Sequence, residues 1–376
     1  MKVIDFIKNH ANAKKLLTEK PYCISVKEDD DYMLLKYDQI NSDFNEEIVR
    51  ECRGLVIDKH TLEPVALSFY KFFNVQEPLA DKIDWNTATV QEKVDGSKLL
   101  VWFDTYTRNW RVSTSGMLDA RDAKVNDFGT TFYDLFERAV GGKDCVDDFF
   151  LTLDVNKCFT FELVSPMSKV VVEYDKTKLY LIGVRDMSTL EEKSPAIYYN
   201  RGLGKFCSLP KQYSLHTLSE CLSAVQHMGT DQEGFVVVDK DWHRIKIKSP
   251  VYVVAHHLKN NGTITRKRVY EIICNGEQDE FLSYFPEYKD YFDEINEAGR
   301  QLSNTLVLAT STLHEKKDEP RKVLAEFINT QYKQIAPLLF KFVDLGFDEI
   351  KHKNWWFELP QQTQLGYIER FIKEKK

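Results

Sequence analysis

The sequence lacks the features that mark several common classes of protein. No apolar run approaches the about 18 residues that a membrane-spanning helix needs. The seven cysteines are scattered, with no C-x-x-C pair and no close Cys/His spacing of the kind that binds structural zinc. Charges interrupt the apolar positions of the opening "MKVIDFIKNHANAKK", unlike a secretory signal. We therefore expect a cytoplasmic protein with reduced, mostly buried thiols and no membrane association.

The chain also lacks an excess of positive charge, since its formal net charge is −7 over 376 residues. This balance argues against a protein that coats nucleic acid non-specifically, but it is compatible with a local basic cleft. With 43% hydrophobic and 29% charged residues, the composition is that of a globular protein. The length exceeds that of a usual single domain, so two domains are expected.

Short β-rich runs and turns alternate from about residue 20 to residue 250. Val, Ile, Phe and Tyr dominate these runs, and Gly, Asp and Asn separate them, which favours antiparallel sheets. Helices are expected between them, around 121–140 and 217–227. This arrangement predicts an α+β fold and not a regular βαβ alternation. The runs that predict strands are "DYMLLKYD", "RGLVID", "ATVQEKV", "KLLVWFD", "WRVSTS", "CFTFELV", "KLYLIGVRD", "GFVVVD" and "RIKIKS".

The pattern changes after about residue 253, where strand signals fade and helical spacing takes over. Val323, Leu324, Phe327 and Ile328 illustrate this spacing. We predict two domains: an α+β domain over 1–253, with antiparallel sheets and flanking helices, and an all-α domain over 254–376. The polar stretch "HHLKNNGTITRKR" leads into the second domain.

The segment "VQEKVDGSKLL" places Lys93 between a predicted strand and a tight polar turn. This lysine is either an ordinary surface charge or a side chain positioned to react, and Lys-x-Asp-Gly alone is weak grounds for a choice. Asp95 suits the turn, and Gly96 lets the backbone turn and approach a nucleotide closely. A lysine amine attacks phosphorus only when it is deprotonated, yet its usual pKa is about 10.4. Nearby cations would favour the neutral amine.

Other motifs accompany Lys93 in a definite order. Lys246 and Lys248 are two positions apart, so they share one face of their strand, although such a run alone is most simply a half-exposed strand. Glu162 stands inside an apolar run, where an ionised carboxylate needs a partner. The complete set is "ECRG" with Arg53, "KFFN" with Lys71 and Phe73, "FTFELV" with Glu162, "QEGFVVV" with Glu233 and Gly234, and "RIKIKS" with Lys246 and Lys248.

This series resembles the covalent nucleotidyltransferase superfamily of ATP-dependent ligases and mRNA capping enzymes. The "ECRG" and "KFFN" motifs and the helical C-terminal region look more narrowly like the bacteriophage tRNA-repair RNA ligases. The resemblance runs through about residues 35–255. One departure is "VSTSGM", where Ser115 stands at the position of a basic residue in those ligases. Arg111 or Arg121 could supply the missing phosphate contact.

The resemblance implies a role for each matching residue. Lys93 would carry AMP from ATP, Glu162 would contact the ribose, and Glu233 would act near a metal-bound triphosphate. Lys246 and Lys248 would stabilise phosphate charge and keep the Lys93 amine neutral. The implied nucleotide site also includes Arg53 and Lys71 at phosphates, Phe73 shaping the pocket, and Asp95, Gly96 and Gly234.

The resemblance also implies the partners of the reaction. Magnesium or manganese would be held by Glu233 or Glu162, through water. The substrate would be RNA with 5′-phosphate and 3′-hydroxyl ends, such as a cleaved tRNA, and a monomer is expected. Three alternatives stay open: a capping guanylyltransferase, a DNA ligase, and a non-catalytic RNA-binding relic. The first two would be expected to continue into a β-barrel, whereas this tail has helical spacing.

Overall fold

The computed structural model describes residues 1–125, 129–257 and 264–372, and the chain divides into two compact units, Met1–Lys259 and Asn260–Lys376. The boundary that we predicted after residue 253 falls inside helix α8 (Pro250–His257), which belongs to the first unit. Part of the polar stretch that follows lies outside the described residues. No helix in the described part of the chain is long and apolar enough to cross a membrane.

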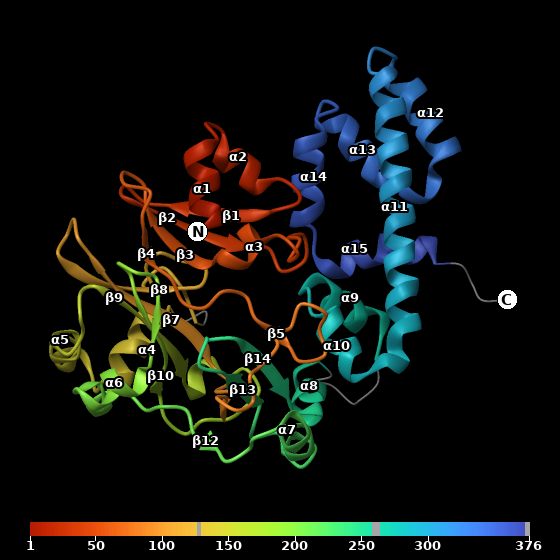
Figure 1. Ribbon diagram of the computed structural model, residues 1–376. Coiled ribbons are helices and arrows are strands. Elements are labelled where there is room, and N and C mark those ends of the chain that lie inside the picture. Colours follow the sequence, from red (N-terminus) through yellow and green to blue (C-terminus); the bar gives the residue numbers. More distant parts are fainter. Residues whose placement is uncertain (126–128, 258–263, 373–376) are drawn as a thin grey trace. The chain divides into compact units, whose positions relative to one another are not determined.

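The first sheet of unit 1 is antiparallel, with the strand order β1-β2-β3-β4. Short helices lie against it, and their Val3, Ile4 and Leu17 share one core with Leu35 and Leu55 of the sheet (Figure 1). The strands are β1 (Ile24–Glu28), β2 (Tyr32–Tyr37), β3 (Arg53–Asp58) and β4 (Pro64–Ala66), and the helices are α1 (Lys2–Asn9), α2 (Ala13–Thr18) and α3 (Glu47–Glu51).

The second sheet has the order β11-β10-β9-β7-β8 and is also antiparallel. Its core is rich in phenylalanine, because Phe159 and Phe161 of the sheet pack with Phe136 and Phe149 of two helices. The strands are β7 (Ser97–Asp104), β8 (Asn109–Thr114), β9 (Lys157–Val164), β10 (Lys178–Asp186) and β11 (Glu192–Lys193), and the helices are α4 (Phe132–Ala139), α5 (Val146–Leu151) and α6 (Pro195–Asn200).

The third sheet has the order β12-β6-β13-β14-β5, in which only β14 and β5 pair in parallel. Ile245 and Ile247 of β14 are buried in a core with Cys221 of helix α7. Since side chains alternate along a strand, this burial turns Lys246 and Lys248 to the other face. The elements are β5 (Phe73–Asn74), β6 (Thr89–Glu92), β12 (Gln212–Tyr213), β13 (Gly234–Val238), β14 (Arg244–Lys248) and α7 (Leu218–Val225).

In the described part of unit 2, every regular element is a helix, and the longest is α11 with 27 residues. Unit 1 is built of sheets with helices, so the predicted α+β class with a helical C-terminal region is confirmed. The helices are α9 (Arg266–Cys274), α10 (Gln278–Tyr284), α11 (Lys289–Glu315), α12 (Arg321–Gln331), α13 (Ala336–Asp344), α14 (Glu349–Glu358) and α15 (Gln361–Ile368).

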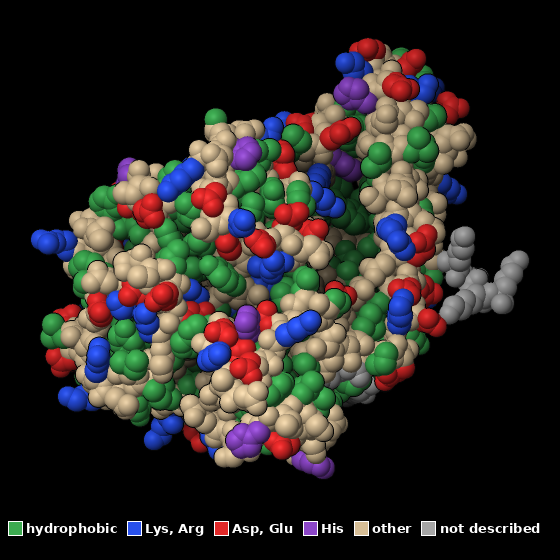
Figure 2. Space-filling model, in the orientation of Figure 1, with side chains coloured by type: hydrophobic (Ala, Val, Ile, Leu, Met, Phe, Trp, Pro, Cys, Tyr) green, Lys and Arg blue, Asp and Glu red, His purple; other side chains and the backbone are tan. Residues whose placement is uncertain are grey.

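All nine runs that predicted strands contain one, but the helix expected around 121–140 is confirmed only for Phe132–Ala139. It starts there because the Thr131 side chain accepts a hydrogen bond from the Asp134 amide, and the Asp134 carboxylate accepts one from the Thr131 amide. The helix expected around 217–227 is α7. None of the seven cysteines, all of which lie in the described part of the chain, forms a disulfide bond, and four of them are buried. On the face drawn in Figure 2, Lys and Arg side chains are interspersed with Asp and Glu.

Candidate active site

A cavity of about 290 Å³ in unit 1 collects side chains from all three sheets. We call it the nucleotide cleft. Six of the predicted site residues line it, although they lie far apart in the sequence. They are Arg53, Lys93, Gly96, Glu162, Lys246 and Lys248.

Lys93 follows strand β6 directly, and its backbone amide donates to the Gly234 carbonyl at 2.9 Å. Its Nζ donates to Glu233 Oε2 at 2.7 Å, and Nζ of Lys248 lies 3.4 Å from the other oxygen, Oε1. The Glu233 side chain is only 3% exposed. We predicted that cations crowd the Lys93 amine, and the structure adds a buried carboxylate that bridges Lys93 and Lys248.

The β13–β14 pair presents the two predicted lysines to the cleft. Lys246 is opposite Val236 and Lys248 is opposite Gly234 in the antiparallel register. Gly234 has φ +142°, and a Cβ there would lie 2.2 Å from the Ile247 carbonyl oxygen. Only glycine fits this close pairing without a shift of the backbone, so Gly234 acts here through strand geometry.

Glu162 and Lys98 are direct cross-strand neighbours on β9 and β7, and both line the cleft. Burial raises the pKa of Glu162 to about 7, against the opposing effect of Lys93 and Arg53. Burial also lowers the pKa of Lys98 well below its ordinary value. Lys98 Nζ donates to the Arg53 carbonyl at 2.8 Å and to Ser68 Oγ at 2.7 Å. Lys98 therefore ties strand β3 to the wall of the cleft.

Arg53 carries a buried donor that is not satisfied within the described chain. Its Nη1 is buried there without a hydrogen-bond partner, and its guanidinium carbon lies 4.9 Å from the Phe72 ring. A buried guanidinium N–H left without an acceptor is rare, and a phosphate oxygen suits it well. This position fits the predicted phosphate contact.

The Asp95 side chain binds other parts of the fold. Its Oδ2 accepts from the amides of Val171 at 2.9 Å and Val172 at 2.8 Å, and its Oδ1 accepts from the Tyr252 hydroxyl at 2.7 Å. A Cβ on Gly96 would lie 2.3 Å from the Leu163 carbonyl oxygen. The glycine thus permits a close approach to strand β9, where we had expected an approach to a nucleotide.

Lys71 and Phe73 lie beside the nucleotide cleft, in the lining of a neighbouring cavity of about 750 Å³. Lys71 Nζ is 4.6 Å from the Phe44 ring centroid and 5.5 Å from that of Phe73. Phe72 lines both cavities. Of the two adjacent phenylalanines, the structure therefore places Phe72 in the cleft.

The cleft residues that the sequence analysis did not assign include Lys98, Phe72 and Arg244. A signal existed for Lys98, because a lysine two positions after Gly96 opens the apolar run "KLLVWFD". Arg111 and Arg121 were the two residues that could replace the phosphate contact missing at Ser115, but both make other contacts. Arg111 pairs with Asp29 and Asp104, and Arg121 pairs with Asp119.

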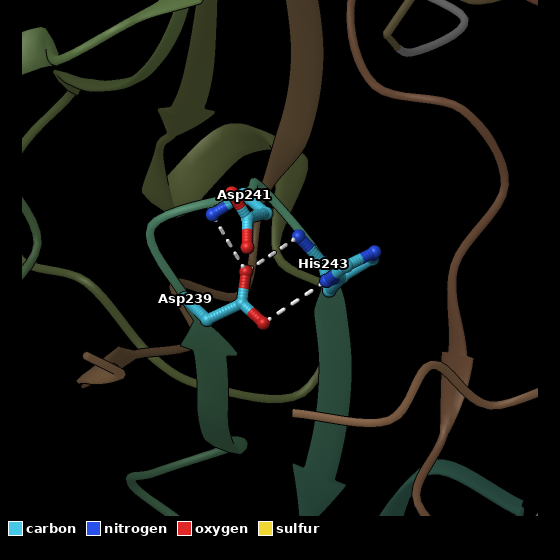
Figure 3. Close-up of side chains that lie close together, drawn as sticks. All are labelled: Asp239, Asp241 and His243. Carbon is cyan, nitrogen blue, oxygen red and sulfur yellow. Dashed lines mark hydrogen bonds and ion pairs between the residues drawn. The ribbon is translucent and has the colours of Figure 1, made fainter. Parts of the chain in front are cut away.

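Asp239, Asp241 and His243 lie close together at the turn between β13 and β14 (Figure 3). Asp239 Oδ1 accepts from the backbone amides of Asp241 and His243, both at 3.0 Å, and Oδ2 lies 3.0 Å from His243 Nδ1. These bonds account for the grouping as a stabilised turn. Glu162 lines the cleft and Glu233 binds Lys93, and both carboxylates offer the hard oxygen donors that magnesium and manganese prefer.

The model of the RNA ligase family matches residues 51–252, more than half of the chain. The chain therefore belongs to the RNA ligase family, and the predicted family is confirmed. The matched segment contains Lys93 and all the other predicted site residues.

Two viral relatives and one solved structure are similar to this chain. A protein named "Putative bifunctional polynucleotide kinase/RNA ligase", from Autographa californica nuclear polyhedrosis virus, is 29% identical over 307 residues, which cover 76% of this chain and 43% of that protein. An RNA ligase of Rhodothermus phage RM378 is 25% identical over 338 residues, which cover 79% of this chain and 73% of that protein. The structure of an archaeal ATP-dependent RNA ligase matches with a TM-score of 0.46 at 12% identity, and the match covers 79% of this chain and 82% of that one. The chain thus spans less than half the length of the first relative.

Proposed function

We propose that this protein is an ATP-dependent RNA ligase that works through a lysine–adenylate. The observation that carries the proposal is the cleft itself, in a chain of the RNA ligase family. Lys93, three further lysines and an arginine with one buried, unsatisfied nitrogen converge on one cavity of nucleotide size. Convergent cations with a nucleophile suit phosphoryl transfer, which depends chiefly on alignment and charge neutralisation.

In the first step, the Lys93 amine attacks the α-phosphorus of ATP. A nitrogen–phosphorus bond forms as the bond to the pyrophosphate oxygen breaks. The proton that the ammonium must lose passes to Glu233, whose Oε2 lies 2.7 Å from Nζ. Arg53, Lys246 and Lys248 stabilise the negative charge on the attacked phosphate and on the departing pyrophosphate.

In the second step, an oxygen of the RNA 5′-phosphate attacks the AMP phosphorus. The nitrogen–phosphorus bond breaks and Lys93 leaves as an amine. In the third step, a 3′-hydroxyl attacks the 5′-phosphorus of the RNA, AMP leaves, and the strand is sealed. The substrate is RNA with 5′-phosphate and 3′-hydroxyl ends, such as a cleaved tRNA, and the helical region after residue 253 selects it.

The cleft fits a divalent ion, magnesium or manganese, bound with the nucleotide. Glu162 and Glu233 would hold it through water, since Glu162 lines the cleft, Glu233 binds the cleft residue Lys93, and a hard ion prefers oxygen. The ion would neutralise phosphate charge alongside the lysines. We further propose that Glu162 contacts the ribose, that Lys71 and Phe73 act from the neighbouring cavity, and that the protein works as a cytoplasmic monomer.

The test is covalent labelling with α-labelled ATP and magnesium, followed by denaturing electrophoresis. We expect label on wild type and on Lys14→Ala, an exposed lysine, and none on Lys93→Ala. Equal label on wild type and Lys93→Ala would contradict the proposal. Labelling by GTP in place of ATP would indicate a capping enzyme, and preferential sealing of nicked duplex DNA would indicate a DNA ligase. Retention of RNA by a wild type that takes no label would indicate the non-catalytic relic.

A further inference from the structure

The cavity of about 750 Å³ beside the nucleotide cleft, which we call the outer cavity, shares part of its wall with that cleft. Phe69, Phe72 and Arg244 line both. The Phe72 ring centroid lies 4.9 Å from the guanidinium carbon of Arg53 and 5.8 Å from Lys246 Nζ. Because these two cations are the proposed phosphate ligands, the outer cavity borders the phosphate side of the cleft.

Two buried arginines in the lining of the outer cavity share one glutamate as their partner. Arg185 and Arg244 are each 5% exposed, and both bind Glu192. Arg185 Nη2 lies 2.7 Å from Oε1, and Arg244 Nη2 lies 2.6 Å from Oε2. Two guanidiniums share one carboxylate, so this buried group carries one positive charge in excess. A buried charge without its counter-ion favours an anionic ligand.

The remaining charges of the lining leave this excess in place. The lining also contains three further cations and three further carboxylates, and it includes His243, whose pKa is raised by its hydrogen bond to Asp239. The cations are Arg50, Lys71 and Lys240, and the carboxylates are Asp81, Glu191 and Asp241. The lining therefore offers a net positive charge to a ligand.

Two partly exposed aromatic rings stand beside the buried arginines. Tyr70 is 41% exposed, and its ring lies 5.4 Å from the Arg185 guanidinium carbon. The Trp242 ring centroid lies 5.6 Å from the guanidinium carbon of Arg244. Trp242 also has φ +66°, a left-handed conformation that is strained for a bulky side chain. This conformation belongs to the turn between β13 and β14, which holds the Trp242 ring beside Arg244.

We propose that the outer cavity binds the first nucleotides of the 5′-phosphorylated RNA strand. Bases stack on Tyr70 and Trp242, and phosphates meet the positive charge of Arg185, Arg244 and Lys240. Stacking on aromatic rings combined with a basic groove is the general way in which proteins hold single-stranded nucleic acid. We assign the 5′ end of the RNA to this cavity because the 5′-phosphate must reach the AMP on Lys93, and the cavity borders the phosphate side of the nucleotide cleft. The inference rests on the proposed ligase function.

The β- and γ-phosphates of ATP share the phosphate chemistry of an RNA end, but they bring no bases for the two rings. Separate assays of the reaction steps distinguish the two ligands. Self-adenylation uses the triphosphate, whereas transfer of AMP from purified enzyme–AMP uses the RNA 5′ end. Binding of a 3′-labelled, 5′-phosphorylated single-stranded RNA, measured by fluorescence anisotropy, needs no catalysis at all.

We expect Trp242→Ala and Tyr70→Ala each to weaken RNA binding, and AMP transfer at sub-saturating RNA, by about tenfold. Self-adenylation should stay within about twofold of wild type, which also shows that the variants fold. The matched variants Trp242→Phe and Tyr70→Phe keep a stacking ring and should retain most of the transfer rate. Lys240→Gln, which changes an exposed side chain, should weaken binding and reduce its salt dependence.

Three outcomes would overturn the inference. Loss of self-adenylation with intact transfer would assign the cavity to the ATP tail. Intact transfer with slower sealing of pre-adenylylated RNA would assign it to the 3′-hydroxyl strand. Equal RNA binding by wild type and both alanine variants would show that the outer cavity is not an RNA-binding site. If wild type binds RNA through these residues but is not covalently labelled by ATP, the result would support the inference and contradict only the proposed function.

Discussion

The Tyr252 hydroxyl donates a hydrogen bond of 2.7 Å to Asp95 Oδ1, although 157 positions separate the two residues. The bond ties the Lys93 turn to helix α8, at the end of the family-matched segment. Together with the amides of Val171 and Val172, it occupies both oxygens of the carboxylate. In this structure, Asp95 therefore holds the turn that presents Lys93.

Removal of this hydroxyl should destabilise unit 1. Tyr252→Phe leaves a buried carboxylate oxygen short of one donor, which should cost about 1 to 3 kcal/mol of unfolding free energy. The measurement is urea denaturation followed by circular dichroism. Tyr106→Phe is the matched control, because its hydroxyl also binds an aspartate, Asp58, but the residue is 46% exposed. Equal losses from the two variants would contradict the role assigned to Asp95.

Gly96 should tolerate no side chain. In Gly96→Ala the Cβ would lie 2.3 Å from a backbone oxygen of Leu163, which cannot move as a side chain does. We expect a loss of about 1 to 3 kcal/mol in stability, or more if the turn breaks, measured by thermal unfolding. Gly116→Ala is the control, since its nearest neighbour is the flexible Lys36 ammonium at 3.5 Å. A fully stable Gly96→Ala protein would show that the turn differs from this structure.

Glu233→Gln should slow the formation of the lysine–adenylate by about a hundredfold. The substitution keeps the size of the side chain but removes the carboxylate that bridges Lys93 and Lys248. Single-turnover labelling with α-labelled ATP measures the rate. Glu173→Gln, which neutralises a 78% exposed glutamate, should label at the wild-type rate. If Glu233→Gln also keeps that rate, another group accepts the Lys93 proton.

Glu162 should make the stability of the protein depend on pH. Its pKa is about 7 in the folded protein and 4.5 ordinarily, so the folded state binds this proton more tightly than the unfolded chain does. The contribution to stability is fully present below about pH 4.5 and is lost as the pH rises through 7.

The expected result is that wild type loses stability relative to Glu162→Gln between pH 5 and pH 8, by about 2 kcal/mol. Denaturation at several pH values measures this difference. Glu63→Gln, at a side chain that is 65% exposed, should show little change over the same range. A difference between wild type and Glu162→Gln that stays constant with pH would mean that the carboxyl titrates normally.

Much of the fold follows from local pattern. The alternation in "RIKIKS" predicted one face for Lys246 and Lys248, and the burial of Ile245 and Ile247 agrees with it. The change to helical spacing after residue 253 likewise predicted a helical region. The helix around 121–140 was predicted too long, because the capping pair Thr131 and Asp134 sets its start more sharply than composition does.

The site was predicted less completely, since its geometry depends on distant partners. Lys98 reads as an ordinary strand lysine until its contact with the Arg53 carbonyl, 45 positions away, is known. Phe72 and Phe73 are equivalent in sequence, and only the tertiary packing turns Phe72 toward the nucleotide cleft. The roles assigned to the individual site residues stay predictions until the variants are measured.

The amino-acid sequence by itself determined the order of the reactive motifs, the α+β class and the family, because each depends on residue type and short-range spacing. The tertiary structure alone decided that Glu233 bridges two lysines, that Asp95 serves the scaffold, and that an aromatic, positively charged cavity lies beside the cleft. The physical reason is that hydrogen bonds and buried charges act over a few ångströms in space. Only folding brings residues from three sheets within that distance.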